Sequence, residues 1–470
     1  MNIRIFFCTI LIFVTTSCVT FDNSFEKKTL ATPTDSWRNL DFNQTLKDQN
    51  TTFWVNSFKI TQLSESVNFA WKKNEDLIYA AEQTIARGEE AIINGSNLLP
   101  QVDLGVNGSR SKRNLIGFNL PNGNTSFTSD SFNSGLNLSW EIDLWGKIKD
   151  QQKSGNKKFQ MAHYEYEAMK QSLAANVVKN WFSIVENKKQ FELSKKTSTT
   201  FKKNHELLAN RFANGLASLL DKDLALNAFT SAQANQVMRQ RLLNGSIRKF
   251  ELLLGKPVNS LSDGNFSYNL PDMKLIPIPP TPSQTLENRP DLKAAHKKLE
   301  ALGYDLKVAQ KSLLPSISIS GNTGSRADEF SNLLEKNFRT WEFSGSIMQP
   351  IFNNGRIKAN IRRSKALESA AIANYRSTAL KAFSEVETFF ANENFLKNEV
   401  SFLNKASEAA NSAANASWNR YQNGVLGIFD TLESQRRAYE AESRLLSMRK
   451  ERIINRIRLY LALGAPALPK

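Results

Sequence analysis

The sequence predicts a mixed α and β membrane protein made of two similar halves, each with two strands and two very long helices. Three observations predict this class: a repeat at a fixed offset, four segments in which apolar and polar residues alternate, and two proline-free stretches at 147–256 and 351–465. The chain of 470 residues is 41% hydrophobic and 23% charged, with a mean hydropathy of −0.41. This composition excludes both a disordered chain and a bundle of membrane-spanning helices.

The first eighteen residues have the features of a bacterial secretion signal. Arg4 supplies a positive charge, residues 5–14 are apolar, and small residues precede Cys18. The segment resembles a lipoprotein signal, in which the cysteine becomes the lipid-modified first residue, and Val19 after it resembles sorting to the outer membrane. Cleavage by the ordinary signal peptidase, which would leave a free thiol, is the alternative. We expect a signal peptide at 1–17, lipidation of Cys18 and an N-terminal anchor segment at 18–60.

An internal repeat covers most of the chain. GKIK at 146–149 matches GRIK at 355–358, RFANG at 211–215 matches RYQNG at 420–424, and LLLG at 252–255 matches LALG at 461–464, each at an offset of 209 residues. LLP at 98–100 recurs at 313–315. A fixed offset of this kind indicates a duplicated unit. We therefore expect repeats at 61–258 and 290–465, joined by a proline-rich linker at 259–289.

Each repeat contains two segments with the period of a β-strand. Their apolar positions are Val102, Leu104 and Val106; Phe132, Leu136, Leu138, Trp140, Ile142 and Leu144; Ile317 and Ile319; and Trp341, Phe343, Ile347 and Ile351. Polar loops are expected at 110–130 and 325–339. Such alternation is typical of a strand with lipid on one side and water on the other, although a half-buried strand of a soluble sheet has the same period. Four strands cannot close a barrel, and an open sheet edge is not tolerated in lipid, so several chains must contribute.

Helices are expected before the strands, at 63–94 and 291–311, and after them, in the two proline-free stretches. Each stretch is interrupted once, at Gly215 and at 424–427, which leaves helices of about 60 and 35 residues. The longer one spans roughly 90 Å at about 1.5 Å per residue. Their apolar residues form narrow stripes, which indicates coiled-coil-like packing with much water contact.

The order of these motifs resembles the outer-membrane efflux proteins of the TolC type, in particular the lipoprotein channels that serve drug efflux pumps. The resemblance rests on LLP at 98–100, WEIDLWG at 140–146, NRPDL at 288–292, QPIFNNG at 349–355 and RYQNG at 420–424, and it covers residues 60–465. It implies a homotrimer with a twelve-stranded outer-membrane β-barrel, four strands per chain, continuous with a twelve-helix periplasmic α-barrel. It also implies a lipid-anchored channel that passively exports substrates handed on by a periplasmic adaptor and an inner-membrane pump.

The residues around the second helix break are the candidate periplasmic gate. Asp430 and Glu433 lie three residues apart and therefore share one helix face. By resemblance they match the acidic pair that narrows the family's entrance, with Tyr421 at its constriction tyrosine. In a trimer they would form two rings of carboxylates that raise one another's pKa and attract cations. The alternative is that both are solvated acids, which a first helical turn favours.

Other positions complete this prediction. Asp221 is the counterpart of Asp430 in the first repeat, whereas Leu224 replaces the second acid. Leu426 occupies the position of an arginine that, by resemblance, locks the closed state, so an apolar constriction is expected there. The turns that resemble adaptor-docking tips contain Gly215, Leu216, Gly424 and Val425.

No enzymatic activity, cofactor, metal or nucleic-acid partner is expected. The sequence lacks phosphate-loop, nucleophile-elbow and zinc-protease motifs. His163, His205 and His296 are isolated, and two cysteines cannot form a disulfide framework. The net charge of +16 is spread along the predicted helices and does not form a patch. The alternative functions are the outer-membrane channel of a type I protein secretion system and a secreted coiled-coil structural or adhesion protein.

Overall fold

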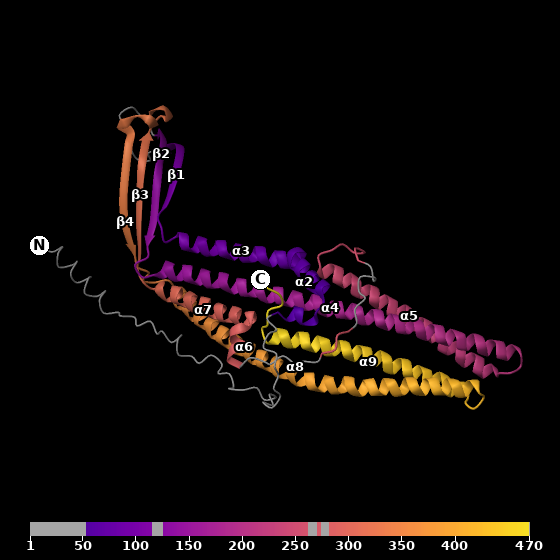
Figure 1. The fold of residues 1–470 in the computed structure, drawn as a ribbon. Coiled ribbons are helices and arrows are strands. Elements are labelled where there is room, and N and C mark those ends of the chain that lie inside the picture. Colours follow the sequence, from indigo (N-terminus) through magenta and orange to yellow (C-terminus); the bar gives the residue numbers. More distant parts are fainter. Residues whose placement is uncertain (1–52, 115–125, 262–269, 274–281, 470) are drawn as a thin grey trace. The chain divides into compact units, whose positions relative to one another are not determined.

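The computed structural model describes residues 53–114, 126–261, 270–273 and 282–469. Its elements, in chain order, are η2 (Trp54–Phe58), α2 (Thr61–Lys73), α3 (Glu75–Ser96), β1 (Gln101–Asn114), β2 (Ser126–Ile142), α4 (Lys147–Ala213), α5 (Leu219–Leu253), α6 (Pro282–Asn288), α7 (Pro290–Lys311), β3 (Ser316–Ala327), η4 (Phe330–Leu334), η5 (Lys336–Phe338), β4 (Arg339–Met348), α8 (Arg356–Gln422) and α9 (Ile428–Ala462) (Figure 1). The expected signal peptide, Cys18, most of the anchor segment and part of the linker lie outside the described residues.

The long helices of the two halves repeat at the offset of 209 residues found in the sequence. α4 and α8 each have 67 residues, and α5 and α9 each have 35 residues. α8 and α9 each begin 209 residues after their counterparts, α4 and α5. In the described ranges, the glycines with positive φ also form pairs at this offset: Gly146 with Gly355, Gly215 with Gly424, and Gly255 with Gly464. All six lie at helix ends, where the chain adopts the left-handed conformation, which costs glycine less free energy than any other residue.

The four strands form one antiparallel sheet in the order β1-β2-β3-β4. The register places Leu104, Leu136, Thr323 and Trp341 in one row across the sheet, and Asp103, Asn137, Asn322 and Glu342 in the adjacent row. Because successive side chains point to opposite faces of a sheet, one face is mainly apolar and the other polar. On the polar face, Asn322 Nδ2 donates to Asn137 Oδ1 at 2.5 Å. The predicted alternation is thus confirmed.

Several predicted boundaries were wrong. The helix expected at 63–94 is two helices, because Asn74 is extended and its side chain caps α3 by accepting a hydrogen bond from the Leu77 amide at 3.0 Å. β1 and β3 continue into the expected loops, and η4 and η5 occupy the rest of the second one. Leu144 and Ile351 lie beyond the ends of β2 and β4. Alternation cannot locate a strand end where residues on both faces are polar, as at 107–114.

The long helices form two hairpins, which contact each other where α4 packs on α9. α4 packs on α5, α8 packs on α9, and α4 also contacts α3, α7 and α9 (Figure 1). The main core lies where α2, α4, α5 and the end of α9 meet, around Phe182, Phe250 and Ile457. Trp54 N donates to Pro466 O at 3.2 Å, so the described part of the anchor segment is tied to the C-terminal end. No helix in the described part of the chain is both long and apolar enough to cross a membrane.

Candidate functional site

The two helix breaks are tight turns of the same construction. After α4, Gly215 N donates to Phe212 O at 2.9 Å and Leu216 N donates to Arg211 O at 2.8 Å. The matching residues after α8 make the same two bonds. Nothing lies within 4 Å of the Cβ position at either tip glycine, and Leu216 and Val425 are exposed. The expected docking tips are therefore accessible ends of helix hairpins.

Tyr421 lies in the last turn of α8, and its side chain is buried against the first repeat. Its hydroxyl accepts a hydrogen bond from Arg211 Nη1 at 2.9 Å, and the guanidinium carbon of Arg211 lies 5.2 Å from the ring centroid. The ring belongs to an apolar cluster with Phe201, Ile428 and Leu432. This Arg211–Tyr421 contact, named the clasp below, joins the ends of α4 and α8.

Asp430 and Glu433 lie in the first turns of α9 but have different surroundings. Asp430 is exposed. Glu433 Oε1 accepts hydrogen bonds from Arg436 Nη2 and Arg437 Nε, both at 2.8 Å. These bonds lower the pKa of the Glu433 carboxyl to about 2. In one chain, therefore, the arginines lower this pKa, which differs from the expectation that neighbouring carboxylates raise it.

Asp221 and Leu426 also have local roles. Asp221 and Ser218 form a capping box at the start of α5, in which Ser218 Oγ donates to Asp221 Oδ2 at 2.7 Å and accepts from the Asp221 amide at 3.1 Å. Leu426 is half-buried in the turn before α9. Asp221 therefore has a structural function, because its contacts with Ser218 satisfy backbone groups at the start of α5.

Sequence reasoning missed the basic partners of these residues. The spacing of Arg436 and Arg437 from Glu433, three and four positions along one helix, could have indicated an ion pair. Arg211 lies in a motif that the repeat singled out, but its contact with Tyr421 depends on how α4 packs near α8. Within the described ranges, no group of three or more His, Cys, Asp or Glu could hold a metal ion.

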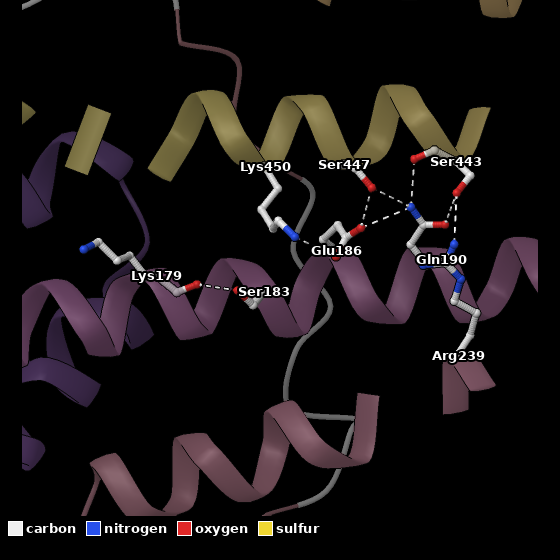
Figure 2. A network of polar contacts seen from close by, with 8 residues as sticks. All are labelled: Lys179, Ser183, Glu186, Gln190, Arg239, Ser443, Ser447 and Lys450. Carbon is white, nitrogen blue, oxygen red and sulfur yellow. Dashed lines mark hydrogen bonds and ion pairs between the residues drawn. The ribbon is translucent and has the colours of Figure 1, made fainter. Parts of the chain in front are cut away.

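A buried polar network joins α4 to α9 (Figure 2). Glu186 Oε1 accepts a hydrogen bond from Ser447 Oγ at 3.1 Å, and Glu186 Oε2 lies 3.3 Å from Lys450 Nζ. Gln190 Nε2 donates to Ser443 O at 2.8 Å, and Ser443 Oγ donates back to Gln190 Oε1 at 2.8 Å. Buried polar groups need such partners, because an unpaired one costs free energy.

The contacts between α4 and α9 continue toward the tips. Tyr439 OH donates to Thr200 Oγ1 at 3.1 Å, and Asn204 Nδ2 donates to Gln435 Oε1 at 2.8 Å. These polar contacts between α9 and α4, from Glu186 to Asn204, are named the in-chain seam below. Beside it lies a groove of about 570 Å³, whose lining from α4, α5 and α9 includes Phe201, Arg239, Phe429, Glu433, Arg436 and Tyr439. Glu433, one of the two candidate gate acids, therefore faces a groove between helices.

A duplicated chain with an amphipathic four-stranded sheet and paired helices of 67 and 35 residues has the architecture of an outer-membrane channel subunit. The family model described as "Outer membrane efflux protein" matches residues 68–256 and 281–465. The chain belongs to this family, and its fold is the mixed α and β fold of these channels.

Similar proteins agree with this assignment. The chain is 26% identical to the outer membrane protein OprJ of Pseudomonas aeruginosa, over 92% of this chain and 89% of the relative. It is 24% identical to the pyoverdine export outer membrane protein OpmQ of Pseudomonas putida, over 90% and 89%. Among solved structures, the CmeC outer membrane channel of Campylobacter jejuni superimposes with a TM-score of 0.86 at 24% identity, over 93% of this chain and 94% of that one. A membrane protein from Pseudomonas aeruginosa gives a TM-score of 0.80 at 26% identity, over 93% and 98%. The protein is an efflux channel of the outer membrane.

Proposed function

We propose that three copies of this chain form one closed channel, and that the channel is the exit duct of a tripartite efflux pump. The observation that carries the proposal is the sheet, in which β1 and β4 have no neighbour on their outer sides among the described strands. Unpaired backbone groups at a sheet edge are costly in lipid. Because each chain supplies an even number of antiparallel strands, β4 of one copy fits antiparallel beside β1 of the next. Three copies then give the twelve-stranded barrel and the twelve-helix α-barrel.

The proposed channel depends on two partners, a periplasmic adaptor and an inner-membrane pump. The adaptor would contact the exposed tips at Gly215–Leu216 and Gly424–Val425. Pyoverdine export and toluene efflux appear in the names of similar Pseudomonas putida proteins, and these names support a small-molecule cargo for this chain. The energy for transport would come from the pump.

The proposed gate is the tip end of the helices. Tyr421 and Leu426 would narrow the entrance, and Asp221, Asp430 and Glu433 would give it an acidic lining. The clasp from Arg211 to the Tyr421 hydroxyl would hold the entrance closed, in place of the arginine that Leu426 replaces. A hydrogen bond to a charged donor suits this task, because it is stronger than a neutral one and still reversible.

Lipidation of Cys18 is the proposed membrane anchor of the mature chain. The sequence pattern before Cys18 supports it, and one acyl chain alone binds a membrane only marginally. The barrel would supply the rest of the attachment to the outer membrane.

The purified protein in detergent tests the proposal. We expect a native mass of three chains, and ion conductance after insertion into planar bilayers. In cells that lack their own channel, the gene should restore efflux of a fluorescent dye when the adaptor and pump are present. Secretion of a protein substrate without dye efflux would favour the type I system, and a monomer without conductance would overturn the channel.

A further inference from the structure

The junction of β4 with α8 concentrates positive charge, and it is an exception to the even spread of charge along the helices. Residues 343–367 contain five cations and no acid, whereas the equivalent residues 134–158 of the first half contain five cations and three acids. All five cations of the second half are exposed, and none forms an ion pair within the described part of the chain. They are Arg356, Lys358, Arg362, Arg363 and Lys365.

The three acids of the first half have partners at the start of α4. Glu141 Oε1 lies 2.6 Å from Lys147 Nζ, and Asp150 Oδ2 lies 2.6 Å from Lys311 Nζ. Asp143 accepts hydrogen bonds from two backbone amides of the first turn, at 2.9 and 2.8 Å. The second half has no carboxylate at the equivalent positions, which are Pro350, Phe352 and Ala359. The negative partner of the α8 cations therefore comes from outside the described chain.

The five cations lie on two sides of α8. Arg356 lines a cavity of about 520 Å³ together with Ser316 and Met348. These two residues lie on the polar face of the sheet, because each is six positions from a residue of that face, Asn322 or Glu342. At about 100° per residue, three cations are rotated by roughly 180–240° from Arg356 and share the opposite side of the helix. This set, named the outer basic face below, is Lys358, Arg362 and Lys365.

Apolar surface leads directly to the outer basic face. Phe343 and Ile347 belong to the apolar face of β4, and Ile351 and Phe352, which follow the strand, are 88% and 86% exposed. Lipid covers the apolar face of such a strand. The headgroup layer beyond the hydrocarbon core is roughly 5–8 Å thick, and long cationic side chains reach back toward it from positions further along a helix. The outer basic face thus begins where phospholipid headgroups lie.

We propose that the outer basic face binds the phosphate group of an anionic phospholipid in the periplasmic leaflet of the outer membrane, with Ile351 and Phe352 against its acyl chains. The inference rests on the outer-membrane channel proposed above. A phospholipid fits both parts of the surface, because it joins an anion to apolar chains. Since the acids of the first half neutralise its matching junction, each chain has one such site, and a channel of three chains has three.

Native mass spectrometry of the full-length protein in detergent tests this site. Titration with dioleoyl phosphatidylglycerol should give three bound lipids per three chains. Dioleoyl phosphatidylcholine has the same acyl chains and no net charge, and we expect it to bind at least ten-fold more weakly. Equal affinity for the two lipids would overturn the inference.

Two double variants separate the sides of α8. Lys358→Gln with Lys365→Gln removes two charges from the outer basic face, and it should weaken phosphatidylglycerol binding about 30-fold, since each cation near an anionic lipid contributes about five-fold. Arg356→Gln with Arg363→Gln is the matched control, because it removes two charges at the same seven-residue spacing from the other side. We expect a loss below three-fold for the control. Equal losses would contradict the site, since diffuse attraction by the whole segment would then explain the binding.

The conservative variant and a competing anion complete the test. Lys358→Arg with Lys365→Arg should bind phosphatidylglycerol as the unmodified chain does. Inorganic phosphate at the concentration of the lipid should leave the lipid bound, because it has no acyl chains. Displacement of the lipid by this phosphate would assign the surface to a free anion and overturn the inference.

The native mass and the conductance separate two ways of failing. A conducting channel of three chains without a preference for phosphatidylglycerol would remove the lipid site and leave the channel standing. The same holds if Lys358→Gln with Lys365→Gln separates the chains but leaves lipid affinity unchanged, since these cations would then pair with acids of another copy. A single chain without conductance would remove both proposals.

Discussion

Removal of one hydroxyl group should open the proposed gate. Tyr421→Phe keeps the ring, its packing and the Arg211 guanidinium beside it, but loses the hydrogen bond at 2.9 Å. A hydrogen bond to a charged group contributes about 1.5–3 kcal/mol, and partial exposure of Arg211 reduces this to about 1 kcal/mol per chain. If the three clasps of a trimer break together, opening becomes easier by about 3 kcal/mol, which is roughly a 100-fold change in the ratio of open to closed channels.

Single-channel recording in planar bilayers measures this ratio directly. Arg211→Leu should increase the open fraction at least as much as Tyr421→Phe. Arg420→Leu is the matched control. Arg420 is the exposed repeat counterpart of Arg211 in the last turn of α8, so this substitution removes the same charge from an equivalent position. A Tyr421→Phe channel that opens no more often than the unmodified channel would refute the role of the clasp.

Four further outcomes follow from the structure and the sequence. Asp430→Ala should weaken block by multivalent cations more than Glu433→Ala, because Arg436 and Arg437 offset the charge of Glu433; equal effects in bilayer titrations would contradict this. The pKa of Glu433 is about 2, below its unfolded value of about 4.3. The stabilisation from its ion pairs is therefore complete above about pH 4.3, and it is lost only as the pH falls toward 2. The selectivity difference between the unmodified channel and Glu433→Gln should therefore be constant from about pH 7 to 4.5. Phe343→Arg, on the apolar face of the sheet, should cost roughly 2–4 kcal/mol if it lies near mid-membrane, and Ser344→Arg much less, as read from the amount of folded trimer in membranes. Cys18→Ala should lack the acyl mass of the unmodified protein in mass spectrometry.

Local chemistry explains why the helices and the faces of the sheet could be predicted from the sequence. Helix length is limited by the residues that end helices, and the proline-free stretches have their tip glycines, Gly215 and Gly424, at positive φ. Alternation fixes the faces, because a slip of one residue would move Trp341 and Phe343 to the polar side. The break at Asn74 was missed, because the helical pattern continues through it and only the cap hydrogen bond marks it.

The candidate site was less predictable, because its partners come from distant parts of the chain. Tyr421 could be singled out from a motif, but its donor Arg211 lies 210 positions away. The in-chain seam has the same character: Gln190 and Ser443 are 253 positions apart, and neither residue type indicates burial. Periodicity reports which face of a helix is apolar, and it does not report which polar residues are paired beneath a neighbouring helix.

The repeat also separates what the fold requires from what each half adds. At equivalent positions the first half has Ile184, Leu243 and Ile247, and the second half has Glu393, Arg452 and Arg456; all six are buried. Glu393 Oε1 lies 2.6 Å from Arg456 Nη2 and 3.4 Å from Arg452 Nε. Buried ion pairs are seldom more stabilising than apolar residues of similar volume, so stability alone does not account for the charges. Arg452 also donates to Met273 O in the linker between the halves, a contact that an apolar side chain could not make. The second half therefore carries buried charges at the place where it must hold the segment that joins it to the first.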